Sequence, residues 1–208
     1  MSREPERRKY DSLRRTEQAL LTRAGIAEAA RRLFVAHGWT ATTVRDVAKE
    51  AGVSVPTVYS AYGDKAGLLR ALADSTGLAA DIGAQLDELE DPAAGPGRQL
   101  AAMAAYDRRL FERAGDVIAL IREAGRTDPD FAAAYLDGRG RGDRTREQVF
   151  LSWPKGTLRP GLDIRTAVDV YAAVCNIDVY TTLTVERGWT AERVEAWWGA
   201  ALGRELLA

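Results

Sequence analysis

The sequence predicts an all-α fold divided between two domains. Glycine and proline interrupt it at intervals of about 10 to 25 residues, and apolar side chains recur between these breaks with the period of a helix. No segment shows the alternation of apolar and polar residues that is typical of a strand. A length of 208 residues suits one or two domains with buried cores.

The composition excludes several kinds of site. A single cysteine, Cys175, leaves no intrachain disulfide and no cysteine-rich metal centre, and a single histidine, His37, leaves no histidine pair for zinc. No apolar run is long enough to span a membrane, and the N-terminus lacks the apolar stretch of a signal peptide. No nucleophile motif is present. We therefore expect a cytoplasmic protein without a membrane partner, metal, cofactor or catalytic residue.

Charge is distributed unevenly along the chain. Residues 1–70 carry 13 Lys and Arg against 8 Asp and Glu, a net charge of +5, whereas residues 71–208 carry 16 against 22, a net charge of −6. The whole-chain charge of −1 therefore averages two oppositely charged parts. A basic first third indicates an anionic partner at that end, although a solvated basic face would give the same sum.

Helix signals organise the basic part. After a flexible basic tail at residues 1–15, we expect helices over 16–37, 43–51 and 55–62. Gly38 ends the first helix, because glycine tolerates a positive φ. Thr42 or Thr43 caps the second helix, and Ser54 caps the third, whose first turn holds a proline.

The acidic remainder is expected to be helical throughout. Its helices are predicted over 64–89, 98–113, 116–125, 128–152, 163–187 and 190–207. A proline- and glycine-rich loop at 91–97 and a turn at 153–161 separate them. Three glycines between Gly138 and Gly142 weaken the helix over 128–152, because each costs about 1 kcal/mol relative to alanine.

The two short helices of the basic part have the spacing of a helix-turn-helix. Gly52, Val53 and Ser54 form the turn between them, and Val58 can pack back onto the first helix. The N-terminal residues of the second helix then face outward. A helix presented in this way fits the major groove of DNA, with its first residues at the base edges. This motif defines a DNA-binding domain over 16–63, followed by a second domain over 64–208.

Residues 26–72 resemble the DNA-binding domain of the tetracycline-repressor (TetR) family. About twenty positions at fixed spacing carry the resemblance: Ile26, Ala29, Ala30, Leu33, Phe34, Gly38, Thr42, Thr43, Val47, Ala48, Ala51, Gly52, Val53, Ser54, Thr57, Val58, Tyr59, Tyr62, Lys65, Leu68 and Leu69. The resemblance implies a dimeric repressor that small ligands release from its operator. It also implies that Lys65 binds a phosphate of the DNA backbone.

The expected DNA contacts are Thr43, Arg45, Ser54, Val55, Pro56, Thr57, Tyr59 and Lys65. The hydroxyl of Thr43, at a helix N-terminus, suits a phosphate. Arg45 either reads a guanine in bidentate fashion or touches phosphate alone. Tyr59 either donates to phosphate or packs in the core. The basic tail either adds DNA contacts or stays solvated.

The second domain is expected to bind a ligand and to dimerise. Aromatic residues and one polar residue are the expected pocket lining: Tyr106, Phe111, Tyr135, Phe150, Trp153, Tyr171 and Asn176. Such aromatics suit an apolar cavity and equally suit a core. Asn176 and Asp178 are polar groups on an apolar helix, so they bind either a ligand or a second subunit.

The last two predicted helices carry broad apolar stripes that a two-fold bundle would bury. The expected dimer interface comprises Val179, Leu183, Val194, Trp197, Trp198, Ala201 and Leu202. Because Trp197 and Trp198 are adjacent, they point to different faces of their helix, and one pair of tryptophans can cover both a core and a second surface.

The sequence thus predicts an N-terminal three-helix helix-turn-helix DNA-binding domain joined to a C-terminal helical ligand-binding and dimerisation domain. The expected protein is a homodimeric transcriptional regulator, a repressor released from a pseudo-palindromic operator on double-stranded DNA by a small apolar effector. The alternative is a helical protein that binds a small molecule or partner with little or no DNA binding.

Overall fold

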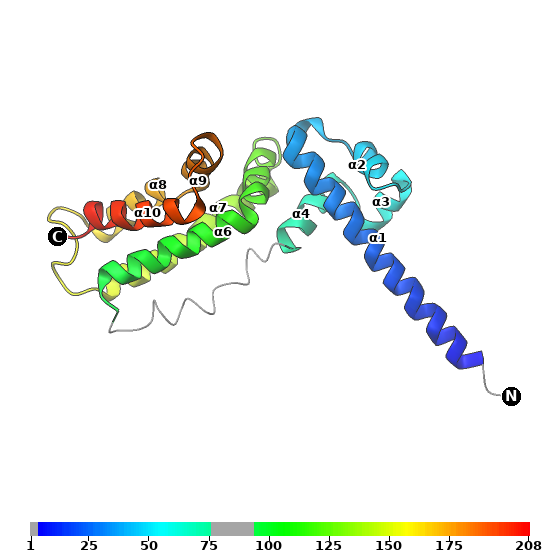
Figure 1. The fold of residues 1–208 in the computed structure, drawn as a ribbon, viewed down its shortest axis with the longest axis horizontal. Coiled ribbons are helices and arrows are strands. Elements are labelled where there is room, and N and C mark those ends of the chain that lie inside the picture. Colours follow the sequence, from blue (N-terminus) through cyan, green and yellow to red (C-terminus); the bar gives the residue numbers. More distant parts are fainter. Residues whose placement is uncertain (1–3, 76–93) are drawn as a thin grey trace. The chain divides into compact units, whose positions relative to one another are not determined.

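The computed structural model describes residues 4–75 and 94–208, with side chains from residue 16 onward, and those residues are helical apart from short connections (Figure 1). Contacts divide the chain into two compact units, Met1–Ser75 and Thr76–Ala208. No helix among the described residues is long and apolar enough to cross a membrane. The predicted continuation of the fourth helix from residue 76 to residue 89 lies outside the described residues.

Four helices make up the first unit: α1 Glu4–Ala41, α2 Val44–Glu50, α3 Val55–Tyr62 and α4 Lys65–Ser75. The C-terminal half of α1 packs on α2 and α4, and α3 packs on α2 and α4. Apolar side chains from all four helices form the core: Ile26, Ala30, Phe34, Val47, Val58, Leu68, Leu69 and Leu72. Because α4 buries three leucines in this core, the first domain ends near Ser75 and not at residue 63 as the sequence predicted.

The N-terminal segment differs from the predicted flexible tail of residues 1–15, because α1 is helical from Glu4. Proline at position 5 is tolerated in the first helical turn, and the charged residues after it are good helix formers. Gly38 is confirmed as the end of the regular helix, since its φ of 79° and ψ of 168° are not helical.

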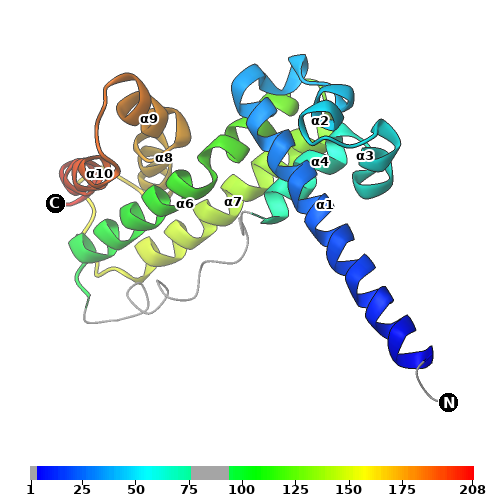
Figure 2. The ribbon, with the colours of Figure 1, turned by 45° about the vertical axis from the view of Figure 1, so that its right-hand side comes forward.

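The second unit contains α6 Pro96–Ala124, α7 Pro129–Ser152, α8 Ile164–Val174, α9 Ile177–Thr181, the π-helix η1 Thr182–Glu186, and α10 Ala191–Leu206. Helices α6 and α7 run side by side, and α10 packs on α6 and α8 (Figure 2). An isolated bridge between Leu158 and Leu207 fastens the 153–161 turn to the end of α10. Trp198, Tyr171 and Leu202 are completely buried at the centre of this core.

One predicted helix break is absent from this unit, and the helix that its glycines weaken is continuous. Helix α6 runs through Gly115, where the sequence indicated an end, and α7 runs through the three glycines from Gly138 to Gly142. A break appears elsewhere, because the helix predicted over 163–187 stops at Cys175. The Asn176 side chain then caps α9 by accepting hydrogen bonds from the backbone N–H groups of Asp178 and Val179, both at 3.0 Å.

Gly115 marks a close packing contact, and we expect Gly115→Ala to destabilise the protein. A Cβ atom at this position would lie 2.7 Å from Cδ1 of Ile177. Overpacking of this kind costs about 1–3 kcal/mol, which outweighs the gain in helix propensity. Urea denaturation measures the loss. Gly203→Ala is the matched control on α10, because a Cβ there meets nothing within 4 Å. A Gly115→Ala variant more stable than the wild type would contradict this packing argument.

Candidate functional site

The helix-turn-helix is fixed by a cap at the start of each of its two helices, α2 and α3. The Thr43 backbone N–H donates to the Asp46 carboxylate at 2.9 Å, and the Asp46 N–H donates back to the Thr43 hydroxyl at 3.2 Å. Hydrogen bonds from the Thr43 side chain and backbone lower the pKa of Asp46. Gly52 adopts a φ of 66° between the helices, and the Ser54 hydroxyl accepts the Thr57 N–H at 3.3 Å. The predicted caps of both helices are confirmed.

The start of α3 is open to solvent, as a DNA-reading helix requires. Thr43, Arg45, Ser54 and Pro56 are exposed, whereas Val55 and Thr57 are half-buried. Tyr59 is 50% exposed, so its ring does not belong to the core. The predicted DNA contacts at the start of α2 and on α3 are therefore exposed or half-buried.

Lys65 is engaged within its own domain. Its ammonium donates to the Trp39 carbonyl and lies 4.3 Å from the centre of the Trp39 ring. This contact competes with the phosphate role that the family resemblance implies for Lys65. That role stays a prediction.

Sequence reasoning missed the contact that holds α3 against α1. The Tyr62 hydroxyl donates to the Arg23 carbonyl at 2.8 Å, and the Arg23 guanidinium lies 4.6 Å from the centre of the Tyr62 ring. The Arg23 guanidinium also donates to the carbonyl of Ala61. Partial burial raises the pKa of Tyr62, so the hydroxyl keeps its proton and this hydrogen bond. Together these bonds fix the C-terminal end of α3 on α1.

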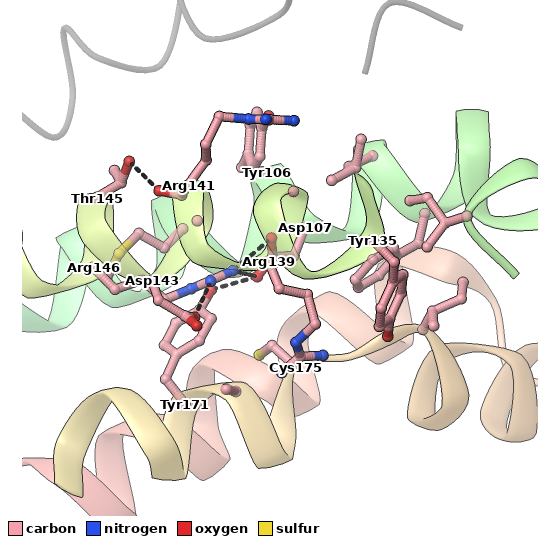
Figure 3. A pocket seen from close by; sticks show the side chains of 18 of the residues that line it. Tyr106, Asp107, Tyr135, Arg139, Arg141, Asp143, Thr145, Arg146, Tyr171 and Cys175 are labelled. Carbon is pink, nitrogen blue, oxygen red and sulfur yellow. Dashed lines mark hydrogen bonds and ion pairs between the residues drawn. The ribbon is translucent and has the colours of Figure 1, made fainter. Parts of the chain in front are cut away.

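The second unit encloses a cavity of about 320 Å³ between α6, α7, α8 and the start of α9. This volume lies at the small end of the range for small-molecule sites. Figure 3 shows its polar side, where Asp107, Arg146 and Tyr171 converge. Apolar side chains from α6 and α9 complete the lining: Met103, Leu110, Phe111, Ile118, Ile121 and Ile177.

A buried ion pair forms one wall of the cavity. Arg146 contacts both Asp107 carboxylate oxygens, at 3.1 and 2.9 Å, and the Tyr171 hydroxyl donates to Asp107 at 2.9 Å (Figure 3). The Arg146 guanidinium lies 4.4 Å from the centre of the Tyr171 ring and also donates to Asp143 at 3.1 Å. Burial, reinforced by the Asp107 charge, raises the pKa of Tyr171 well above its ordinary value, so this hydroxyl remains a donor.

The predicted pocket residues divide between cavity and core. Tyr106, Phe111, Tyr135 and Tyr171 line the cavity. Phe150 and Trp153 do not line it: their rings pack together with centroids 4.7 Å apart, and the indole of Trp153 donates to the Gln99 side chain. These two residues close the core beside the cavity.

Asn176 and Asp178, the two polar residues that were expected to bind a ligand or a second subunit, have partners inside the chain. Besides capping α9, the Asn176 amide donates to the Ala173 carbonyl at 2.8 Å, and Asn176 does not line the cavity. Asp178 pairs with Arg122, whose guanidinium donates to the carboxylate at 2.7 Å and lowers the pKa of Asp178. These contacts satisfy both groups without a ligand or a second subunit.

Most of the predicted dimer interface is buried within one chain. Val194, Trp198 and Leu202 have no exposed surface, and Ala201 retains 7%. These residues pack against α6, which contacts α10 along its length, so they cannot also contact a partner. Trp197 is 36% exposed, and Val179 and Leu183 are half-buried. Of the predicted interface residues, only Trp197, Val179 and Leu183 remain available to another subunit.

The fold and these two sites define a helix-turn-helix protein with a separate cavity-bearing helical domain. Residues 26–72 match the family model described as bacterial regulatory proteins, tetR family. This match confirms the predicted resemblance of residues 26–72 to the DNA-binding domain of that family.

Relatives match part of the chain, and solved structures share its fold. The chain is 44% identical over 80 residues to the HTH-type transcriptional regulator TtgR of Pseudomonas putida, a match that spans 38% of each protein. It shares its fold with NalD, the secondary repressor of the MexAB-OprM multidrug efflux pump in Pseudomonas aeruginosa (TM-score 0.66, 21% identity, 92% of this chain and 98% of NalD). It also shares its fold with SmeT in a triclosan complex (TM-score 0.62, 17% identity, 90% of this chain and 92% of SmeT).

Proposed function

We propose that this chain is a DNA-binding transcriptional regulator, a repressor that a small molecule releases from a pseudo-palindromic operator. The observation that carries this proposal is the exposed N-terminal turn of α3, held by the Ser54 cap, in a basic domain that matches the TetR family model. The second unit is net acidic, so its overall charge disfavours phosphate, in contrast to the basic first unit.

The cavity supports the ligand-responsive part of the proposal. A mostly apolar cavity with a few convergent polar groups is typical of a small-molecule site. One neighbour by fold, SmeT, was solved with triclosan. The ligand changes DNA affinity only if it binds the DNA-bound and free conformations with different affinity.

We further propose that the repressor is a homodimer, because two recognition helices must reach successive major grooves about 34–36 Å apart. Trp197 on α10 is the predicted interface residue that remains the most suitable, since it is large, aromatic and partly exposed.

Binding to DNA tests the proposed function directly. The purified chain is titrated onto random duplex at low and high salt, and onto fragments that it captures from its own genome. We expect weak, salt-dependent binding to random duplex and tighter binding to captured fragments. A chain with no affinity for any duplex at low salt would favour the alternative, a helical protein that binds a small molecule or a partner.

Arg45→Ala separates base reading from phosphate contact. If Arg45 reads a base, the variant loses about 1–3 kcal/mol of binding energy and stops discriminating at one operator position. Affinities measured for single-base variants of a captured operator give the result. Arg32→Ala is the matched control: it removes one positive charge from the same domain, but this arginine pairs with Glu50 at 3.1 Å. A uniform loss across all operator variants would leave Arg45 with a phosphate role alone.

A further inference from the structure

The cavity carries one more positive than negative side chain. Its charged lining residues are Arg139, Arg141, Arg146, Asp107 and Asp143. Arg146 pairs with both aspartates, and Arg141 pairs with Asp137 one turn back on α7. Within the described part of the chain, no hydrogen bond or ion pair holds the guanidinium of Arg139. The unbalanced charge of the cavity is therefore at Arg139.

Arg139 is placed to meet a ligand. It lies on α7 one turn after Tyr135 and is half-buried, and its side chain extends over the cavity in Figure 3. Its charge contributes, after Arg122, to the lowered pKa of Asp178, so the guanidinium faces the start of α9. Asp178 attracts Arg139 only through space, because its carboxylate oxygens bond to Arg122 and no hydrogen bond joins it to Arg139.

The two acidic groups of the cavity, Asp107 and Asp143, both pair with Arg146, so they are unsuited to a cationic ligand. The Asp107 side chain is 3% exposed, and it already accepts bonds from Arg146 and Tyr171. A cation would have to displace Arg146, which would leave a guanidinium buried without its partner at a large cost. A ligand with a positive charge would also face the unbalanced charge of Arg139.

The opposite wall is apolar and accepts a hydrophobic body. Leu110, Phe111, Ile118, Ile121 and Ile177 line it, and the cavity volume of about 320 Å³ limits the ligand to a small molecule. We propose that the cavity binds a small organic carboxylate, with the carboxylate on Arg139 and a flat or extended apolar body against this wall. The planar guanidinium suits bidentate pairing with a carboxylate. As the identity of the effector, this inference rests on the proposed function; as a binding site, it stands without it.

Three probes of matched shape and different charge test the proposal: cinnamate, cinnamyl alcohol and cinnamylamine. Each is titrated calorimetrically into the full chain without DNA. We expect cinnamate to bind about 10- to 100-fold more tightly than the alcohol, the gain of a charge-assisted hydrogen-bonded pair, and the amine to bind most weakly. In Arg139→Gln, cinnamate affinity should fall to that of the alcohol, while the affinity for the alcohol stays unchanged.

Arg144→Gln is the matched control, because it removes the same charge from the same helix at an exposed residue that does not line the cavity. Its preference for cinnamate should equal that of the wild type. Thermal denaturation checks that both variants fold. The proposal is overturned if the amine binds best, if no probe binds at millimolar concentration, or if both variants lose the preference equally. Cinnamate that binds through Arg139 without releasing DNA keeps the carboxylate site and refutes only its role as the effector site. A chain that never binds DNA refutes the proposed function alone.

Discussion

Replacing Asp107 by asparagine is expected to lower the free energy of unfolding by about 3–5 kcal/mol, because it leaves the buried Arg146 guanidinium without its counter-charge. The Arg146 side chain is 14% exposed and the Asp107 side chain is 3% exposed, so water cannot replace the missing carboxylate. Burial alone would lower the pKa of Arg146, but the charge and hydrogen bond of Asp107 together with the Tyr171 and Asp143 contributions outweigh it and hold that pKa above its ordinary value. The arginine thus stays charged and needs its partner.

Urea denaturation of Asp107→Asn and of a control variant distinguishes the buried Asp107–Arg146 pair from an ordinary surface contact. Asp143→Asn is the matched control, because Asp143 also pairs with Arg146, at 3.1 Å, but its side chain is 37% exposed. Its loss should be about 0–1 kcal/mol. Equal losses in Asp107→Asn and Asp143→Asn would mean that burial does not set the strength of this network.

A double variant tests whether the pair stabilises the fold or only avoids an unpaired charge. Asp107→Leu combined with Arg146→Met removes both charges, and we expect it to recover most of the stability lost in Asp107→Asn. The Tyr171 hydroxyl would then lose its acceptor at a cost of about 1–3 kcal/mol. A double variant less stable than Asp107→Asn would show that the ion pair itself contributes net stability.

The caps and turn of the helix-turn-helix could be predicted from the sequence because their signals are local. Thr43 and Ser54 cap their helices through residues three positions further on, and Gly38 and Gly52 adopt the positive φ expected where a helix ends. Each signal can be recognised within a few residues of chain. The Tyr62–Arg23 contact was missed because 39 positions separate the two residues.

The cavity could be predicted only in part, because local signals do not reveal which distant residues pack together. Aromatic residues at helical spacing identify an inward face, but periodicity cannot tell whether the face meets a core or a cavity. Phe150 therefore proved to be core, whereas Tyr135 lines the cavity. The Asp107–Arg146 pair joins residues 39 positions apart on α6 and α7, and only packing reveals that register.

Gly115 and Asn176 were also ambiguous as sequence signals in the second unit. Gly115 allows a close contact with Ile177 inside a continuous helix, although glycine alone indicates a helix end equally well. Asn176 was interpreted as a binding residue because it is polar on an apolar helix. In fact the helix stops there, and an asparagine that ends one helix and caps the next has the same local sequence signature.

Trp198→Ala is expected to cost about 3–5 kcal/mol of folding stability, whereas Trp197→Ala should cost about 1 kcal/mol or less. Trp198 has no exposed surface, and its ring lies 6.0 Å from that of Phe111 and 6.1 Å from that of Tyr180. Removing it opens a large cavity in a packed core. Trp197 is 36% exposed and makes an edge contact with Trp189, 6.2 Å between ring centres. As predicted, the two adjacent tryptophans point to different faces of α10, one buried and one partly exposed.

Urea denaturation and sedimentation measured on both variants separate core packing from subunit contact. Trp198→Phe is the conservative arm: it keeps an aromatic ring, and it removes an indole N–H that has no hydrogen-bond partner among the described residues. Its loss should therefore be well below that of the alanine variant. If the chain dimerises through α10, Trp197→Ala weakens association while each subunit stays folded, since Trp197 is the exposed member of the pair. The opposite pattern, a stable Trp198→Ala monomer and an intact Trp197→Ala dimer, would return Trp198 to the interface that the sequence predicted for it.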